Sequence, residues 1–431
     1  MRKMKDSGIE WIGQIPQEWE ISRVKYLYDV TLGKMLQPAP KSDDDELCSY
    51  ICAANINWSG VDLSVEKKMW FSAKDKESYR LAAGDLLVTE GGDVAVSCIW
   101  NDELSECYIQ NAVHRVRPKS DASNRYLYYW LSTLKATGYI DLVCNKATLA
   151  HFTKDKFDSC VIPVVSADEQ HTIANYLDAK CAEIDALIAA KEKTNALLKE
   201  QRQSIIYEAV TKGLDPNVPM KDSGIEWIGE IPEGWNTVKL SYLFKTIGSG
   251  TTPESSNCEF YDGEYPWLQT GDLNDGIVTE TSKSITRAAV DCYSALNLYK
   301  KGTIIVAMYG ATIGKLGILD IDCYTNQACC AMAEPMETDS KFIYYWLRGN
   351  KDNIVRLSLG GGQPNISQGI IAALKVSLPR EINEQQKISK YLDSKCAEID
   401  TAIATNNETI QKLKEYRQSV IYEAVTGKIE V

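Results

Sequence analysis

The sequence is a tandem duplication, and no other feature constrains the fold as strongly. Residues 220–229 repeat residues 4–13 letter for letter, 216 positions later, and the tetrad Tyr-Tyr-Trp-Leu at 128–131 returns at the same offset at 344–347. Such a repeat means that the unit of folding is the repeat itself. Because the chain has 431 residues, each copy takes up about half of it, and we expect two similar copies.

The two copies differ mainly in their middle. Residues 32–119 and 248–337 keep only scattered matches, whereas the opening and closing stretches of the two copies are nearly identical. Neutral drift in loops is one explanation. Two recognition surfaces that read different targets are the other, and we favour this interpretation because the frame around the divergent middle is so similar.

Each copy closes with a stretch that predicts a long helix. Residues 168–212 contain neither Gly nor Pro and are rich in good helix formers. Apolar residues recur there at spacings that alternate between four and three, which is typical of a heptad seam. A helix of about 40 residues is about 60 Å long at 1.5 Å per residue. The apolar seam positions are Leu177, Ile184, Ile188, Leu198, Ile205, Leu392, Ile399, Ile403, Leu413 and Val420.

The two helices most simply bury these seams against each other. If a two-fold axis perpendicular to both helices relates the copies, the pair is an antiparallel coiled-coil spacer. The alternative is that each helix packs separately on its own globular domain. A polar residue in the seam, such as Asn195 or Asn406, could fix the register at some cost in stability.

The remainder of each copy predicts mixed α and β structure. Short β-branched runs bounded by Gly, Asp and Asn predict strands, and the aromatic tetrads are typical of core packing on short amphipathic helices. The expected fold class is therefore α+β, with two pseudo-symmetric globular domains joined by two long helices. The expected division is a first globular domain at 1–167, a helix at 168–213, a linker and second globular domain at 214–382, and a second helix at 383–431.

No motif offers a convincing catalytic or metal site. The chain has no Pro-Pro pair, as an amine methyltransferase of nucleic acids would have, and its three His residues form no zinc motif. Residues 310–315 faintly resemble a phosphate loop, but the loop is one residue short and is followed by Leu316 where Ser or Thr would bind Mg²⁺. The 13 Cys residues include no CxxC pair, which indicates reduced thiols in the cytoplasm and no disulfide framework.

The charge and hydropathy patterns exclude two further classes. No apolar run approaches the roughly 18 residues that span a bilayer. The formal net charge is −12, and none of the four regions is basic, so bulk charge alone would not bind this chain to nucleic acid.

Several short segments could nevertheless contact DNA. The Gly/Thr loops at 248–253 and 310–315 could present backbone N–H groups to phosphates, and residues 90–93 stand in place of the second loop in the first copy. Amide pairs occur in both copies at one offset, and an amide side chain can bond an adenine edge twice. The basic stretch 114–119 predicts a strand with its cations on one face, and its alternative is a solvated edge strand. The candidate DNA contacts are Gly91, Gly92, Gln110, Asn111, Arg115, Arg117, Thr251, Thr252, Gly310, Thr312, Lys315, Asn326 and Gln327.

Several of these segments together resemble specificity subunits of type I restriction-modification systems. The resemblance rests on residues 7–16 with Trp19, on 169–178, on 202–213, and on 310–315 followed by Asn326 and Gln327, in this order and spacing. It covers essentially the full chain, including the duplication. The first copy departs from the pattern, because Glu-Gly-Gly-Asp replaces the Gly-Ala-Thr-Ile-Gly loop.

The resemblance implies a non-catalytic DNA reader. Each globular domain would be a target-recognition domain that reads one half of a bipartite, asymmetric double-stranded site through the major groove, and the helix pair would set the unread gap. The helices would also bind two modification subunits, which hold S-adenosylmethionine and methylate adenine, while restriction subunits use ATP and Mg²⁺. The chain itself would carry no cofactor and act in the cytoplasm.

Two other functions remain open at this point. One is a duplicated scaffold or adaptor that binds protein through its heptad seams and reads no DNA. The other is an enzyme whose site we do not recognise from the residues.

Overall fold

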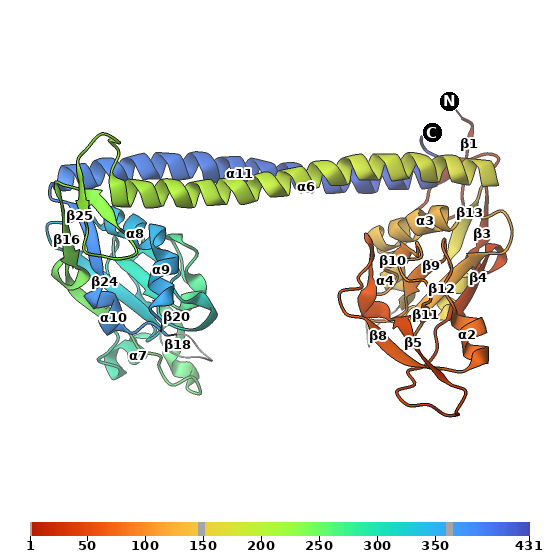
Figure 1. The fold of residues 1–431 in the computed structure, drawn as a ribbon, viewed down its shortest axis with the longest axis horizontal. Coiled ribbons are helices and arrows are strands. Elements are labelled where there is room, and N and C mark those ends of the chain that lie inside the picture. Colours follow the sequence, from red (N-terminus) through yellow and green to blue (C-terminus); the bar gives the residue numbers. More distant parts are fainter. Residues whose placement is uncertain (1, 145–150, 359–364) are drawn as a thin grey trace. The chain divides into compact units, whose positions relative to one another are not determined.

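The computed structural model describes residues 2–144, 151–358 and 365–431. These form two compact units, one made of residues 1–191 with 407–431 and the other of residues 192–406 (Figure 1). We call them unit 1 and unit 2. Each unit contains one globular domain and part of both long helices, α6 (Ala167–Lys212) and α11 (Ile382–Val425). Among the described residues, no helix is long and apolar enough to cross a membrane.

The two long helices pair in antiparallel fashion within each unit. In unit 1, Ile184 and Ile188 of α6 pack against Ile410 of α11. In unit 2, the side chains of Asn195 and Asn406 are buried and joined by a hydrogen bond of 2.9 Å. The alternative in which each helix packs separately on its globular domain is therefore wrong.

The predicted seam is buried at most, but not all, of its positions. Leu198, Ile205, Ile403 and Leu413 are only half-buried, whereas Ile206, which lies outside the seam, is fully buried. The reason is that this part of α6 packs against a third element. A Cβ atom added to Gly349, at the end of α8 (Ser340–Gly349), would lie 3.2 Å from Ile206. The helix therefore turns a different face inward where it also meets the globular domain.

The globular domain of unit 1 is built on a four-stranded sheet in the order β10-β9-β12-β4 and a three-stranded sheet in the order β11-β5-β8. Three two-stranded sheets complete it, in the pairs β1-β2, β3-β13 and β6-β7. Its strands are β1 (Met4–Asp6), β2 (Gln14–Pro16), β3 (Glu20–Arg23), β4 (Tyr28–Leu32), β5 (Glu46–Ile51), β6 (Ile56–Asn57), β7 (Gly60–Val61), β8 (Lys67–Phe71), β9 (Leu86–Thr89), β10 (Ser97–Ile99), β11 (Tyr108–Ile109), β12 (Val113–Pro118) and β13 (Val161–Val164). Its helices are α1 (Val24–Leu27), α2 (Ala73–Tyr79), α3 (Asn124–Ala136), α4 (Tyr139–Cys144) and α5 (Lys154–Ser159).

Unit 2 repeats this plan with an enlarged main sheet in the order β17-β24-β21-β22-β19, a sheet β20-β18-β23, and the pairs β14-β15 and β16-β25. Its strands are β14 (Met220–Asp222), β15 (Glu230–Pro232), β16 (Trp235–Lys239), β17 (Phe244–Ser249), β18 (Tyr261–Leu268), β19 (Gly276–Val278), β20 (Lys283–Ile285), β21 (Ile304–Ala307), β22 (Leu316–Leu319), β23 (Tyr324–Thr325), β24 (Cys329–Pro335) and β25 (Lys375–Pro379). Its shorter helices are α7 (Arg287–Cys292), α8, α9 (Lys351–Arg356) and α10 (Gln368–Ala373).

Equivalent aromatic residues anchor each globular domain to its helices. Trp19 is buried and its indole Nε1 donates a 3.0 Å hydrogen bond to Glu169, at the start of α6. Trp235 makes the same 3.0 Å bond to Glu384 of α11. A buried indole N–H needs a partner, and here both copies supply the same one. The expected fold class, two repeated mixed α and β domains joined by two long helices, is confirmed.

Candidate nucleic-acid interface

Loops from distant parts of the sequence meet at one end of the main sheet in unit 1. Glu90, after β9, donates its backbone N–H to the carbonyl of Ala112 at 3.0 Å, and its own carbonyl accepts from Phe152 at 2.8 Å. Asn111 donates its N–H to the carbonyl of Lys34, just after β4, at 2.9 Å. We call residues 33–37, 90–93, 110–112 and 151–152 loop cluster 1. It brings together the predicted glycine and amide contacts of the first copy.

A glycine makes this close approach possible. A Cβ atom on Gly33 would lie 2.5 Å from the carbonyl carbon of Gln110, a distance that real side chains do not reach. Next to this contact, the amide side chains of Gln110 and Asn111 are half-buried and make no hydrogen bond to another described residue. They remain available to an outside partner.

Unit 2 builds the same arrangement, which we call loop cluster 2. Met308 donates its N–H to Ala328 at 2.8 Å and accepts from Ile366 at 2.9 Å, as Glu90 does with its partners in unit 1. A Cβ atom on Gly250 would lie 1.8 Å from the carbonyl oxygen of Thr325. Loop cluster 2 comprises residues 250–252, 308–315, 326–328 and 365–366. The amide pairs of both copies therefore occupy equivalent places, and residues 90–93 do stand where the Gly-Ala-Thr-Ile-Gly loop stands in unit 2.

The side chains of loop cluster 2 are partly engaged with each other. The hydroxyl group of Thr252 donates a 2.5 Å hydrogen bond to the side-chain oxygen of Gln327. Asn326 accepts at 3.1 Å from the backbone N–H of Ala328 through its side-chain oxygen. Thr312 lies in a 3-10 turn, Gly310–Thr312, and bonds back to Tyr309 at 3.2 Å.

The remaining predicted contacts of this cluster lie close by. Thr251 is half-buried beneath them, with its carbonyl accepting from Trp267 at 3.3 Å. Gly310 adopts φ 66°, a left-handed conformation that favours glycine. Lys315 is half-buried and forms no ion pair with the part of the chain that the structure describes. Lys315 is thus a cation of loop cluster 2 that remains available to an outside partner.

Arg115 and Arg117 lie on β12 and bond to other residues of the domain, Arg115 buried and Arg117 partly exposed. β12 lies between β9 and β4, so the alternative of a solvated edge strand is wrong. Arg115 is buried and donates a 2.8 Å hydrogen bond to the carbonyl of Arg80, and burial lowers the pKa of its guanidinium. Arg117 holds Asp85 through two bonds of 2.5 and 2.7 Å, and this hydrogen bonding raises its pKa.

Loop cluster 1 exposes two apolar residues that were not among the candidate DNA contacts. Met35 is 77% exposed and Leu36 is 57% exposed, directly after the close contact at Gly33. Tyr309, at the start of the equivalent loop in unit 2, is also exposed. One sequence pattern could have identified Met35 and Leu36. Gly33 and Gly250 are 217 positions apart, so the residues that follow the two glycines are equivalent in the two copies.

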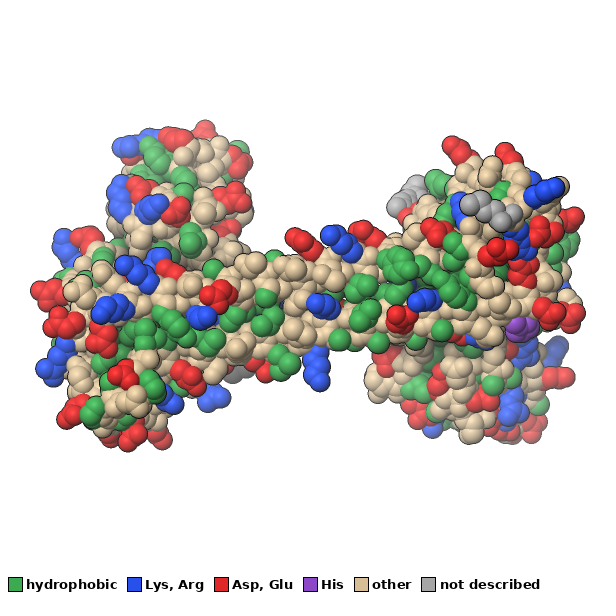
Figure 2. Space-filling view, turned by 90° about the horizontal axis from the view of Figure 1, so that it is seen from above, with side chains coloured by type: hydrophobic (Ala, Val, Ile, Leu, Met, Phe, Trp, Pro, Cys, Tyr) green, Lys and Arg blue, Asp and Glu red, His purple; other side chains and the backbone are tan. Residues whose placement is uncertain are grey.

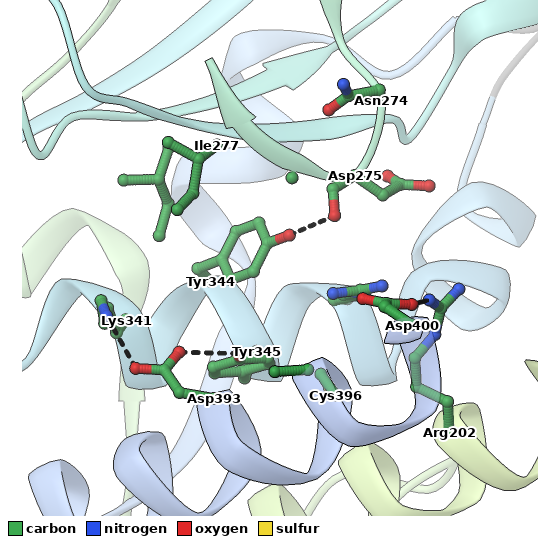
Figure 3. A pocket seen from close by; sticks show the side chains of 14 residues that line it. Arg202, Asn274, Asp275, Ile277, Lys341, Tyr344, Tyr345, Asp393, Cys396 and Asp400 are labelled. Carbon is green, nitrogen blue, oxygen red and sulfur yellow. Dashed lines mark hydrogen bonds and ion pairs between the residues drawn. The ribbon is translucent and has the colours of Figure 1, made fainter. Parts of the chain in front are cut away.

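A second shared feature is a cavity beside the helix pair. In unit 2 it has a volume of about 710 Å³ and lies between β19, α8 and the two long helices (Figure 3). Asp393 of α11 accepts a hydrogen bond from Tyr345 at 2.8 Å and pairs with Lys341 at 2.7 Å. Arg202 of α6 pairs with Asp400 of α11 (Figure 3).

Unit 1 repeats this cavity with the same chemistry in a volume of about 380 Å³. Asp178 accepts from Tyr129 at 2.6 Å and pairs with Arg125, and Arg417 pairs with Asp185 at 3.0 Å. Burial raises the phenol pKa of Tyr129, as it does that of the equivalent tyrosine in unit 2.

The first tyrosine of each tetrad links the same helix to a loop of the globular domain. Tyr128 donates to the carbonyl of Trp58 at 2.8 Å, and Tyr344 donates to the carbonyl of Asp275. The prediction that the tetrads serve core packing is thus correct for their buried rings but incomplete, since the hydroxyl groups tie α3 and α8 to the divergent middle and to the long helices.

The described residues contain no group of three or more His, Cys, Asp or Glu side chains placed to hold a metal ion. Burial raises the thiol pKa of Cys98 and Cys330 to about 12, so these thiols are protonated and unreactive at neutral pH. Figure 2 shows acidic and basic side chains interspersed on the visible face of each unit.

Comparison with known proteins agrees with the resemblance seen in the sequence. Residues 16–199 and 232–415 each match the family model described as the type I restriction modification DNA specificity domain. The type I restriction enzyme MjaVIII specificity subunit of Methanocaldococcus jannaschii is 27% identical over 428 residues, covering 97% of this chain and 94% of the relative. The StySPI specificity subunit of Salmonella potsdam is 22% identical, covering 97% of this chain and 90% of the relative.

Solved structures share the fold. A chain from a study of complex assembly and conformational transition of the type I R-M system superposes with a TM-score of 0.75 at 15% identity, covering 96% of this chain and 99% of that one. The HsdS subunit from Thermoanaerobacter tengcongensis gives a TM-score of 0.53 at 16% identity, covering 96% of this chain and 98% of that one. With both copies matched by the family model, the chain belongs to the type I restriction-modification DNA specificity family.

Proposed function

We propose that this chain is the DNA-reading subunit of a type I restriction-modification complex, in which each loop cluster reads one half of a bipartite, asymmetric site. The observation that carries the proposal is the contrast within the two clusters. Their backbone hydrogen bonds are the same, from Glu90 and Met308 to equivalent partners, whereas the side chains they present differ. A shared frame with different side chains is what two readers of different sequences require.

The chemistry of each cluster suits base edges in the major groove. Amide side chains offer both a donor and an acceptor, which matches the N6 and N7 groups of adenine. Gln110 and Asn111 present such amides in unit 1, and Asn326 and Gln327 do so in unit 2. Backbone N–H groups of the glycine turns at Gly91, Gly92 and Gly310 would position the phosphates without reading sequence.

The chain would bind its partners through features that both copies share. Two identical modification subunits need two equivalent surfaces, and the cavities with Asp178 and Asp393 are equivalent in lining and in ion pairs. Exposed apolar side chains on the adjoining helix segments add contact area, Leu187 and Tyr416 in unit 1 and Leu197 in unit 2. Restriction subunits would join through this assembly. The paired helices would serve as the spacer.

In this assembly the chain would carry out no chemistry and hold no cofactor. The constellations at the two cavities are ion pairs and protonated phenols, which favour a binding role. S-adenosylmethionine would be held by the modification subunits, and ATP with Mg²⁺ by the restriction subunits. The complex would act in the cytoplasm, where its DNA lies.

Selection from randomised duplexes tests this proposal. The chain, purified with its modification subunit, is expected to enrich two short defined elements separated by a gap of fixed length. Replacing Gln110 and Asn111 by Ala is expected to relax one element only, and replacing Gln327 by Ala the other. As a matched control, Asn297→Ala removes an exposed amide that bonds to the carbonyl of Ala295 and lies outside loop cluster 2, and it should change neither element.

Two results would contradict the proposal. Absence of any enriched element in the complex would favour the duplicated scaffold without DNA readout. Methyl transfer by the purified chain alone would favour an enzyme with an unrecognised site.

A further inference from the structure

We propose that Met35 and Leu36 read thymine methyl groups in the half-site of unit 1, so that this half-site contains at least one thymine recognised by apolar contact. The inference rests on the proposed DNA-reading function and extends it to the chemistry of the bases. It starts from the two large apolar side chains that loop cluster 1 leaves 77% and 57% exposed.

The segment that carries these residues is held firmly on both sides. Before them, Lys34 pairs with Asp75 at 2.6 Å. After them, Gln37 is buried, donates a 2.7 Å hydrogen bond to Asp45, and accepts from the backbone N–H of Trp70 at 3.0 Å. The flanking side chains are thus used inside the domain, and only Met35 and Leu36 face outward from an anchored loop.

Sheet register identifies the counterpart of Met35 in unit 2 as Thr252. Leu32 pairs with His114 as Ser249 pairs with Cys330, which makes Gly33 equivalent to Gly250 and therefore places Met35 where Thr252 stands.

This exchange changes what the neighbouring amide can do. Thr252 hydrogen-bonds Gln327. Met35 cannot make the corresponding bond to Asn111, whose side-chain amide makes no hydrogen bond within the described part of the chain. At equivalent positions, unit 2 therefore offers a hydroxyl bound to an amide, whereas unit 1 offers an apolar side chain beside an available amide.

These two groups together match an A·T pair in the major groove. An amide can bond adenine at N6 and N7, and the 5-methyl group of thymine, displayed in the same groove, is the apolar feature among the base edges. Burying that methyl against Met35 or Leu36 would remove apolar surface of both partners from water, which is favourable.

The test uses the complex with its modification subunit and the duplex selected by it. Each thymine of the unit 1 half-site, on either strand, is replaced in turn by uracil, which lacks only the methyl group. At least one replacement is expected to weaken binding about fourfold. The paired variant Met35→Ala with Leu36→Ala is expected to bind the thymine and uracil duplexes equally.

Matched controls separate this effect from general damage. Tyr26→Ala removes a side chain that is 65% exposed and lies before β4, at the end opposite to Met35, and should retain the discrimination. Uracil in the half-site of unit 2 should affect the paired variant and the unaltered complex alike. A third variant, Met35→Thr, introduces the side chain found at position 252 and is expected to reduce the discrimination without altering the fold.

The inference is overturned if the unit 1 half-site contains no thymine on either strand, if uracil binds as well as thymine, or if the paired variant keeps the discrimination. In all three cases a bipartite element is still selected, so the proposed function stands. If the complex selects no element at all, both the inference and the proposed function are wrong.

Discussion

Replacing Arg117 by Met tests whether this cation stabilises the sheet or contacts DNA. Arg117 holds Asp85 through two hydrogen bonds, and the two side chains differ in exposure, 41% for the arginine and 4% for the aspartate. Removing the guanidinium leaves a buried carboxylate that still accepts a 2.9 Å hydrogen bond from the N–H of Ala82. Breaking a buried pair costs about 3–5 kcal/mol. Because Arg117 is partly solvated, we expect a smaller loss of about 2–3 kcal/mol.

Calorimetry of the full chain measures this loss. For a unit of this size, such a change lowers the melting temperature of unit 1 by about 4–10 °C. Lys245→Met is the matched control, because Lys245 pairs with Glu334 at 2.9 Å while both side chains are exposed. Solvent screens such an exposed pair and leaves it little stabilising effect, so this variant should melt almost unchanged.

DNA selection by the same variant completes the test. If Arg117 acts within the sheet, the complex carrying Arg117→Met selects both unaltered half-sites at a temperature where unit 1 is folded. An unchanged melting temperature together with an altered unit 1 half-site would refute the reasoning and return Arg117 to the DNA contacts.

Three further predictions concern the clusters, pH and salt. Gly250→Ala should disrupt loop cluster 2 and weaken selection of the unit 2 half-site alone, because the added Cβ would collide with Thr325. Gly271→Ala, with open space around its Cβ, should leave the selection of both half-sites unchanged. Burial lowers the pKa of His114, whose ring bonds to the carbonyl of Phe152 at 2.8 Å. The imidazole therefore takes up a proton more readily in the unfolded chain, and unit 1 should lose stability as the pH falls below about 6.5. In acid denaturation, His114→Gln should lessen this loss. The isolated chain, with net charge −12, should bind DNA weakly and lose binding steeply with added salt; specific affinity equal to that of the complex would contradict this.

The sequence predicted the features that depend on local pattern or on the repeat. The long helices follow from composition and heptad spacing, and the equivalent placement of Gln110 with Asn326 follows from the offset alone. The exact face of α6 did not follow, because Ile206 is buried by α8, an element far away in sequence. The heptad periodicity of a helix reflects its packing against one partner helix, and it does not predict a contact with a further element.

The placement of single residues within the sheet had the same limit. Alternation correctly indicated that Arg115 and Arg117 lie on a strand, but the position of β12 between β4 and β9 depends on two separate strands that precede it in the sequence. Met35 was missed for a related reason. Its importance arises from the contact between Gly33 and Gln110, which are joined only in the folded chain.

The hydrogen bond between Asn195 and Asn406 restricts how the helix pair can evolve in length. An alignment shifted by one heptad would place Ile399 opposite Asn195, and a buried amide facing an apolar side chain costs about 1–3 kcal/mol. A seven-residue insertion in one helix alone forces such a shift on one side of the pair, whereas matched insertions in both helices preserve it. Gap length should therefore change in paired, discrete steps, and a gene that lengthens only one helix should encode an unstable protein.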